Sequence, residues 1–149
     1  MRSLATAIVI STVSFTTAYA RASGLEDSRH TFIALEAKAD QAPPRDRCFL
    51  YAELVSQMTD VAGQQFNAGD SVQASETLKL IQRYAEKIHM GAADDSKKLK
   101  NAEILMQRTC FRLKGILSEV SYEDRQGLEA ALKQLNQVQA ELMMQVFKK

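Results

Sequence analysis

The sequence contains no tryptophan and only two prolines, two cysteines and two histidines among its 149 residues. It also lacks any run of alternating β-branched residues bounded by turn signals, and we therefore predict essentially no β-strand. Hydrophobic residues make up 46% of the chain and charged residues 25%. These proportions are typical of a folded soluble domain and exclude a disordered or collagen-like chain.

Motifs of nucleophilic and phosphate chemistry are also missing. The chain has no G-x-S-x-G, no H-E-x-x-H and no phosphate-binding glycine loop. Paired carboxylates occur at Glu26-Asp27, Asp94-Asp95 and Glu123-Asp124. Each pair lies at a predicted helix start, where the helix dipole favours acidic side chains without a catalytic role. We therefore predict that the protein is not an enzyme and has no catalytic residues.

The histidines do not form a ligand motif. His30 and His89 are far apart, and neither C-x-x-C, H-x-x-x-H nor the haem-attachment motif C-x-x-C-H occurs. We expect His30 to be solvated near a helix start and His89 to lie beside unpaired carbonyls at a helix end. The methionines that could ligate haem have helical spacing, which favours core packing: Met58, Met90, Met106, Met143 and Met144. We therefore expect no metal and no cofactor.

Cys48 and Cys110 leave three alternatives open: two buried thiols, a disulfide or a functional thiol. Both lie on or beside apolar stripes, where a free cysteine acts as a small hydrophobic residue. If the two helices that carry them run parallel, the residues lie about 5 Å and about 24 Å above the same end of the bundle. A disulfide tolerates a Cα separation of only about 7 Å. The buried thiols are the favoured alternative.

The first 20 residues have the pattern of an export signal. Arg2 precedes an apolar run from Leu4 to Ile10, which continues with interspersed serines and threonines to Ala18, and Ala18-Tyr19-Ala20 forms a small-x-small cleavage site. A second possible cut follows Ala22. The alternative is an uncleaved anchor, but the run of about 15 residues is shorter than the roughly 20 needed to span a bilayer. We predict a signal peptide over 1–20 and a periplasmic or extracellular mature chain that does not span the membrane.

Charge is balanced in the mature chain. Cleavage after Ala20 removes Arg2 and leaves 18 basic against 18 acidic residues. Affinity for nucleic acid depends largely on a basic surface that neutralises phosphates, and this chain offers none overall. We therefore expect no nucleic-acid partner.

Apolar spacing of three and four residues predicts helices over about 29–40, 45–68, 71–89, 95–120 and 121–149. Residues 21–28 are expected to be a flexible start, and Ala42-Pro43-Pro44 breaks the first helix from the second. Gly69 is expected in a left-handed conformation at the end of the second helix. The predicted stripes run through Phe32, Ile33, Leu35 and Ala39; Cys48, Tyr51, Leu54, Val55, Met58, Val61, Ala62 and Phe66; Ala74, Leu78, Ile81, Tyr84, Ala85 and Ile88; Leu99, Ala102, Met106, Thr109, Leu113, Ile116 and Val120; and Leu128, Ala131, Leu135, Val138, Leu142 and Val146.

These segments predict an all-α fold, a small antiparallel helical bundle. Its domain covers 45–149 and is preceded by 21–44, the flexible start with its short helix. Three long helices, one of intermediate length and a shorter N-terminal helix make up the chain.

The segment Met58–Ala85 resembles a single tetratricopeptide unit. Ala62, Phe66, Gly69-Asp70, Ala74 and Leu78 stand near the packing positions of that family. Glu86 occupies the position of the family's closing proline, and no second copy follows at a 34-residue period. Because such repeats gain stability by stacking, we interpret the segment as a generic helical hairpin.

By elimination, the sequence favours an exported binding or structural module that meets a protein partner or associates with itself. The last two helices carry apolar residues beyond a single stripe: Ile104, Leu105, Phe111, Leu117, Leu132, Met143, Met144 and Phe147. Such a surplus must face another helix, another subunit or a partner. The alternatives are that the N-terminal segment covers it, or that the chain is a periplasmic ligand- or metal-binding stress protein.

Overall fold

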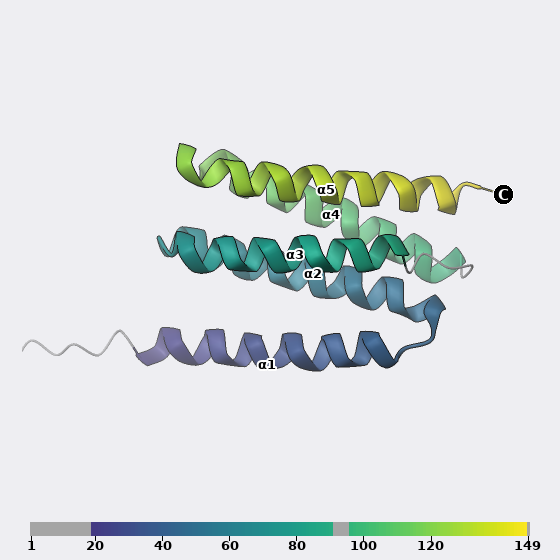
Figure 1. The fold of residues 1–149 in the computed structure, drawn as a ribbon, viewed down its shortest axis with the longest axis horizontal. Coiled ribbons are helices and arrows are strands. Elements are labelled where there is room, and N and C mark those ends of the chain that lie inside the picture. The colour runs from purple at the N-terminus through teal and green to yellow at the C-terminus, as the bar shows by residue number, and fades with distance from the viewer. Residues whose placement is uncertain (1–18, 91–95, 149) are drawn as a thin grey trace, which may run out of the picture.

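Five α-helices follow one another in the computed structural model, which describes residues 19–90 and 96–148. No strand occurs in this part of the chain, and the predicted all-α class is confirmed. The helices are α1 (Tyr19–Gln41), α2 (Pro44–Asn67), α3 (Ser71–Met90), α4 (Ser96–Glu119) and α5 (Tyr122–Val146). Figure 1 shows them lying side by side with their axes along the long dimension of the molecule.

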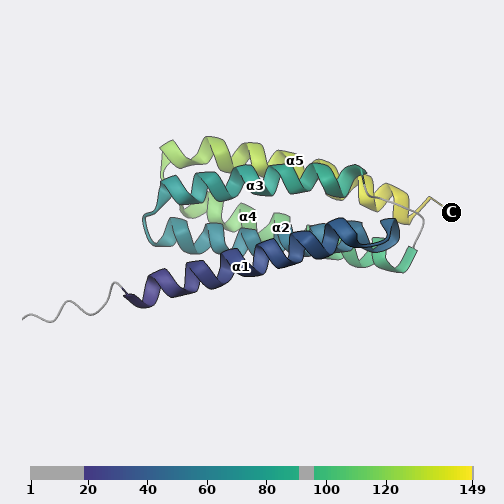
Figure 2. The ribbon, with the colours of Figure 1, turned by 60° about the horizontal axis from the view of Figure 1, so that its bottom comes forward.

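Helices α2 to α5 form a closed ring of contacts. α2 packs against α3 and α4, and α5 packs against the same two helices. α1 lies outside this ring, and its backbone packs against α2, along which it runs in the turned view of Figure 2. The described chain is therefore a four-helix core with a fifth helix on one side.

The predicted stripes form the core of this ring. Every predicted residue of α3 is buried, and so are five in α5: Leu128, Ala131, Leu135, Val138 and Leu142. In α2 and α4 the stripes are buried except at their last positions, where Phe66, Ile116 and Val120 are half-buried. Because these apolar side chains recur at helical spacing, each helix presents one continuous face to its neighbours.

The first helix departs from its prediction. Residues 21–28, expected to be flexible, belong to α1, which at 23 residues is as long as the other helices. The segment has no apolar periodicity and contains no proline. Once a helix is nucleated, propagation adds one hydrogen bond per residue, so a helix held by packing further along the chain can extend through residues that carry no apolar stripe. Ile33 was also placed wrongly, since its side chain is 59% exposed while Ala39 is fully buried.

Proline and glycine mark the two ends of α2, as predicted. Pro44 is the first residue of α2, where its missing N–H costs nothing. At the other end of α2, Gly69 has φ 77°. The Asp70 N–H donates to the Gln65 carbonyl and the Gly69 N–H to the Phe66 carbonyl, both at 2.9 Å. This pair of hydrogen bonds closes the helix and turns the chain into α3.

Both cysteines are buried free thiols, so the disulfide alternative is wrong for this structure. The reason is the register of α2 against α4. Asp46 pairs with Lys98 at 2.9 Å, and Asp60 pairs with Arg112, so the two helices run in the same direction. Cys110 therefore lies at the level of about residue 58 of α2, some ten residues or about 15 Å along the axis from Cys48.

The predicted signal peptide lies almost entirely outside the described residues. α1 begins at Tyr19, so the two expected cleavage positions fall in its first turn. Among the described residues, no helix is long and apolar enough to cross a bilayer.

Candidate functional site

The surplus apolar residues of α4 and α5 divide into two groups. Leu105, Leu117 and Leu132 pack against the core, and Ile104 is half-buried. The others are exposed: Phe111 by 79%, Met143 by 42%, Met144 by 62% and Phe147 by 78%. The expectation of surplus apolar surface is therefore confirmed for half of the set.

Three of the exposed residues lie together at the end of α5. Leu142 is buried and Val146 is half-buried against the core, which fixes the orientation of this last turn. Met143, Met144 and Phe147 consequently project outward within five residues of one another. We call these three residues the terminal apolar patch. α1 does not cover it, because the described part of α1 does not pack against α5.

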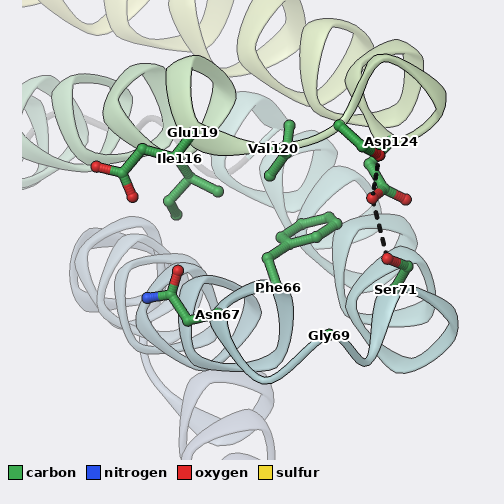
Figure 3. Close-up of a pocket in the computed structure, with 9 residues that line it drawn as sticks. Phe66, Asn67, Gly69, Ser71, Ile116, Glu119, Val120 and Asp124 are labelled. Carbon is green, nitrogen blue, oxygen red and sulfur yellow. Dashed lines mark hydrogen bonds between the residues drawn. The ribbon is translucent and has the colours of Figure 1, made fainter.

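A small pocket lies at the opposite end of the bundle, between the α2–α3 and α4–α5 turns (Figure 3). Its volume is about 300 Å³. Phe66, Ile116 and Val120 form its apolar side, and polar groups of the two turns line the rest: Asn67, Gly69, Ser71, Glu119, Ser121 and Asp124.

The polar groups of this pocket bond to one another. The hydroxyls of Ser71 and Ser121 both donate to Oδ2 of Asp124, at 2.9 and 2.8 Å. Ser71 opens α3 and Asp124 lies in the first turn of α5. The carboxylate therefore ties two helix starts together, where the helix dipoles favour a negative charge. Ser71, Ser121 and Asp124 therefore have a structural role, since their hydrogen bonds hold the two turns together.

A hollow of about 440 Å³ lies on the outer side of α4. Among the described residues, its lining is Gln107, Arg108, Phe111 and Arg112. Arg112 is engaged across the helix interface with Ser56 and Asp60 of α2. The described lining comes from one helix only, so a ligand would be contacted from one side.

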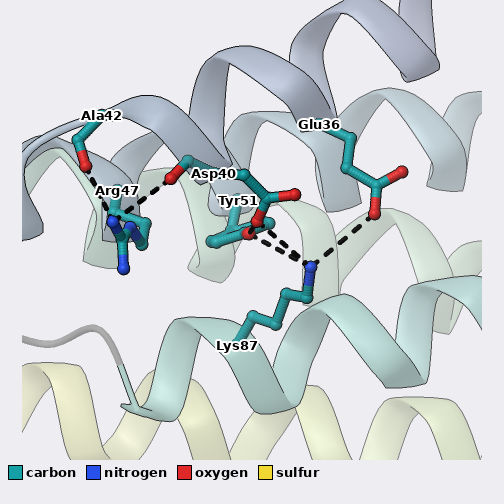
Figure 4. Close-up of polar contacts among 6 residues, drawn as sticks. All are labelled: Glu36, Asp40, Ala42, Arg47, Tyr51 and Lys87. Carbon is teal, nitrogen blue, oxygen red and sulfur yellow. Dashed lines mark hydrogen bonds and ion pairs between the residues drawn. The ribbon is translucent and has the colours of Figure 1, made fainter.

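The most elaborate polar cluster joins α1 to α2 and α3 (Figure 4). Nζ of Lys87 on α3 lies 3.4 Å from Oδ1 of Asp40 and 3.6 Å from Oε1 of Glu36, both on α1. The Tyr51 hydroxyl donates to Asp40. Lys87 also lies over the rings of Tyr51 and Tyr84, 4.9 and 5.4 Å from their centroids. We call Glu36, Asp40, Tyr51, Tyr84 and Lys87 the α1 junction.

Charge and burial shift the pKa values within the α1 junction. The hydrogen bond from Tyr51, helped by Lys87, lowers the pKa of Asp40. Burial, and then the bond to Asp40, raises the pKa of Tyr51. Burial opposes the charge of Lys87, but its contacts with Tyr51 and Asp40 outweigh this, and its pKa is raised. The cluster therefore holds a carboxylate, a neutral phenol and an ammonium group together at neutral pH.

Arg47 completes the attachment of α1. Its Nη2 donates to the carbonyls of Asp40 and Ala42, at 3.2 and 3.0 Å. These are among the last carbonyls of α1 and its connection, which have no partner within the helix. A basic side chain of α2 therefore caps the C-terminus of α1.

The cysteines are poorly suited to nucleophilic chemistry. Burial raises the pKa of both Cys48 and Cys110 to about 11, so the thiolate is scarce at neutral pH. His30 is exposed on α1, and His89 lies in the last turn of α3 with its side chain outside the described part. Among described residues, no three histidine, cysteine or acidic side chains are grouped to hold a metal.

Sequence reasoning missed the α1 junction. Tyr51 and Tyr84 were predicted as core residues, and both are buried. The prediction did not include polar contacts of their hydroxyl groups. Glu36 and Asp40 stand four residues apart and so share a helix face, a signal that was available. Their partner Lys87 is 47 residues beyond Asp40, and no local pattern connects them.

Comparison with protein-family models, with curated proteins and with solved structures finds no match to this chain. The resemblance of Met58–Ala85 to a tetratricopeptide unit thus has no support from a family match. Evidence for function comes from the surface of the molecule itself.

Proposed function

We propose that the chain is an exported, non-enzymatic binding module that meets a protein partner through the terminal apolar patch. In this proposal residues 1–20 act as a signal peptide, and the mature chain works outside the cytoplasm as an antiparallel helical bundle. The partner offers an apolar face or groove of its own, which covers Met143, Met144 and Phe147.

The exposure of the terminal apolar patch is the observation that carries this proposal. Fully burying a methionine or phenylalanine side chain is worth about 1.5–3 kcal/mol. Three neighbouring side chains could therefore supply several kcal/mol to an interface. The other exposed large apolar residues of the described chain lie on four different helices: Ile33, Val72, Phe111 and Tyr122. Single exposed apolar residues are normal on soluble proteins, whereas a group at one helix end is characteristic of a contact surface.

Affinity capture from the native envelope fraction tests the proposal with three forms of the mature chain. These are the wild type, a double variant Met144→Lys/Phe147→Lys, and the matched control Val72→Lys, in which a residue 77% exposed gains the same charge. Helical content and unfolding of all three are compared first. We expect a protein retained by the wild type and by V72K and lost with the double variant.

Equal retention by all three forms would place the contact elsewhere and contradict the role of the patch. The role of the patch would also be contradicted if none of the three forms retained a protein that can be cross-linked to the chain in intact cells. A ligand- or metal-binding role was the alternative from the sequence. No group of potential metal ligands among the described residues favours it.

Export predicts a specific N-terminus. The native protein, isolated from the envelope or the medium, is expected to begin at Arg21 or Ser23. Intact-mass measurement and N-terminal sequencing check this. A cell-associated protein that still begins at Met1 would contradict export with cleavage.

A further inference from the structure

Helix α1 is attached to the core through one face near its C-terminus. Ala39 is fully buried, and Phe32, Leu35 and Ala42 pack partly buried against the core. These positions follow the spacing of three to four residues that defines one side of a helix. Ile33, on another side, is 59% exposed.

The polar contacts of α1 are gathered on the same side. Glu36 and Asp40 are one turn apart and both face Lys87 of α3, as Figure 4 shows. Tyr51 of α2 donates to Asp40, and Tyr84 of α3 stacks on Tyr51 with ring centroids 6.0 Å apart. The surface beneath α1 therefore specifies its occupant: a helix with an apolar stripe and two carboxylates four residues apart.

The connection between α1 and this surface is very short. Only Ala42 and Pro43 separate Gln41, the last residue of α1, from Pro44, the first of α2. Pro43 has φ −57° and ψ 151°, an extended conformation fixed by its ring. Two consecutive prolines also prevent α1 and α2 from merging into one continuous helix. The chain therefore has to reverse direction within two stiff residues for α1 to fold back on its own core.

We propose that α1 exchanges between two copies of this chain, so that each core carries the α1 of the other. The occupant is α1 of a second copy, because it brings the same stripe and the same carboxylates to the same surface. Every contact of the α1 junction is then kept, and only the two-residue connection changes. Exchange of an identical element is a low-cost route to a dimer, and short connections favour it. The proposal is independent of the terminal apolar patch.

The test uses the complete mature chain. Equal amounts of unlabelled and ¹⁵N-labelled protein are unfolded together in urea and refolded at high and at low protein concentration. Light scattering after gel filtration then measures the mass of each fraction. We expect a fraction of twice the monomer mass after refolding at high concentration, which persists for hours after dilution because α1 must undock before it can return.

Zero-length carbodiimide cross-linking identifies the exchanged element. The Lys87 amine lies 3.4 Å from Asp40 and 3.6 Å from Glu36, within the reach of such a reagent. In the dimer, peptides joined between Lys87 and either carboxylate should combine one labelled and one unlabelled chain in about half of the cases, as random pairing of equal chains requires. In the monomer fraction the joined peptides should carry one isotope only.

Two variants distinguish this dimer from other association. Inserting Gly-Ser-Gly-Ser between Ala42 and Pro43 lets α1 fold back without a tight reversal, and we expect the dimer fraction to fall several-fold. Phe147→Lys changes the terminal apolar patch and should leave the dimer fraction unchanged. A protein that stays monomeric under all refolding conditions would overturn the proposal. So would a dimer whose Lys87 cross-links are of single isotope, or one that is lost in F147K but not on lengthening the connection.

Discussion

At the scale of single residues, Lys87 carries an unusual number of contacts. It pairs with Glu36 and Asp40, donates a hydrogen bond to the Tyr51 hydroxyl, and lies over two aromatic rings. Exposed ion pairs contribute little to stability because water screens them. The Lys87 side chain is only 31% exposed, however, and cation–π contacts strengthen when the cation is partly desolvated. Its contribution should therefore exceed that of an ordinary surface pair.

Replacing Lys87 by methionine keeps most of the apolar stem and removes the charge. We expect Lys87→Met to lower the free energy of unfolding by about 1–2 kcal/mol, from the lost ion pairs and cation–π contacts. The matched control is Lys79→Met on the same helix, because Lys79 pairs with Glu76 while both side chains are about two-thirds exposed. That change should cost less than about 0.5 kcal/mol. Urea unfolding followed by circular dichroism measures both, and equal effects would contradict the role given to Lys87.

The pKa shifts predict how stability changes with pH. A lowered pKa means that the folded state holds the ionised form of Asp40, so its contribution is present above its ordinary value of 3.8 and is lost as pH falls through the folded value below it. The raised pKa values of Lys87, Tyr51 and Tyr84 mean that the folded state favours their protonated forms, which contribute to stability at neutral pH. Their contributions are lost as pH rises above the ordinary values of 10.5 for lysine and 10.0 for tyrosine.

Comparison of the wild type with Asp40→Asn checks the acid side. We expect the loss of stability between pH 5 and pH 2 to be shallower in the variant, because it has no carboxylate to protonate at this position. The alkaline loss should become smaller in the variant, because Asp40 helps to raise the pKa values of Tyr51 and Lys87, but it should persist because burial still raises the pKa values of both tyrosines. An identical acid profile for the two proteins would show that Asp40 is not held as an ion by the α1 junction.

At the scale of the helices, two glycines give predictions of opposite sign. Gly115 lies inside α4 with open space around it, and alanine there gains about 1 kcal/mol of helix propensity. Gly69 has φ +77°, a conformation that alanine adopts only with strain. We therefore expect Gly115→Ala to raise the free energy of unfolding by about 1 kcal/mol and Gly69→Ala to lower it by about 1–2 kcal/mol. Thermal and urea unfolding measure both changes.

The helices also show what local sequence can predict. α2 to α5 were predicted to within a few residues because each has an apolar stripe that its neighbours bury. The first half of α1 has no such stripe, so apolar spacing did not predict the helix there. The end of α2 was predictable because only glycine adopts the left-handed turn at position 69 without strain.

At the scale of the whole molecule, long-range pairings were beyond local sequence patterns. In the α1 junction, Lys87 contacts Tyr51, Asp40 and Glu36, which lie 36 to 51 residues earlier in the chain. The sequence predicted that the residues of the terminal apolar patch are surplus to the core stripe. It could not predict that they are exposed, because exposure depends on which helices pack together. Leu105, Leu117 and Leu132 had the same local pattern and proved to be covered.

The proposed exchange of α1 rests on one property of the molecule, its division into a four-helix core and a separately held α1. Exchange of α1 requires a core that stays folded when α1 leaves, and the terminal apolar patch belongs to that core. The backbone of each of α2 to α5 packs against two other core helices, whereas that of α1 packs against α2 alone and reaches α3 only through the side chains of the α1 junction. Elements with fewer buried contacts open at a lower free energy than the global unfolding.

Native-state hydrogen exchange of the mature chain, measured by mass spectrometry, tests this division most directly. We predict that amides of residues 28–41 exchange through a local opening while those of α2 to α5 remain protected, and that Lys87→Met accelerates exchange in α1 alone. If α1 exchanged only together with the core, at the free energy of global unfolding, the division into a core and a separately held helix would be contradicted.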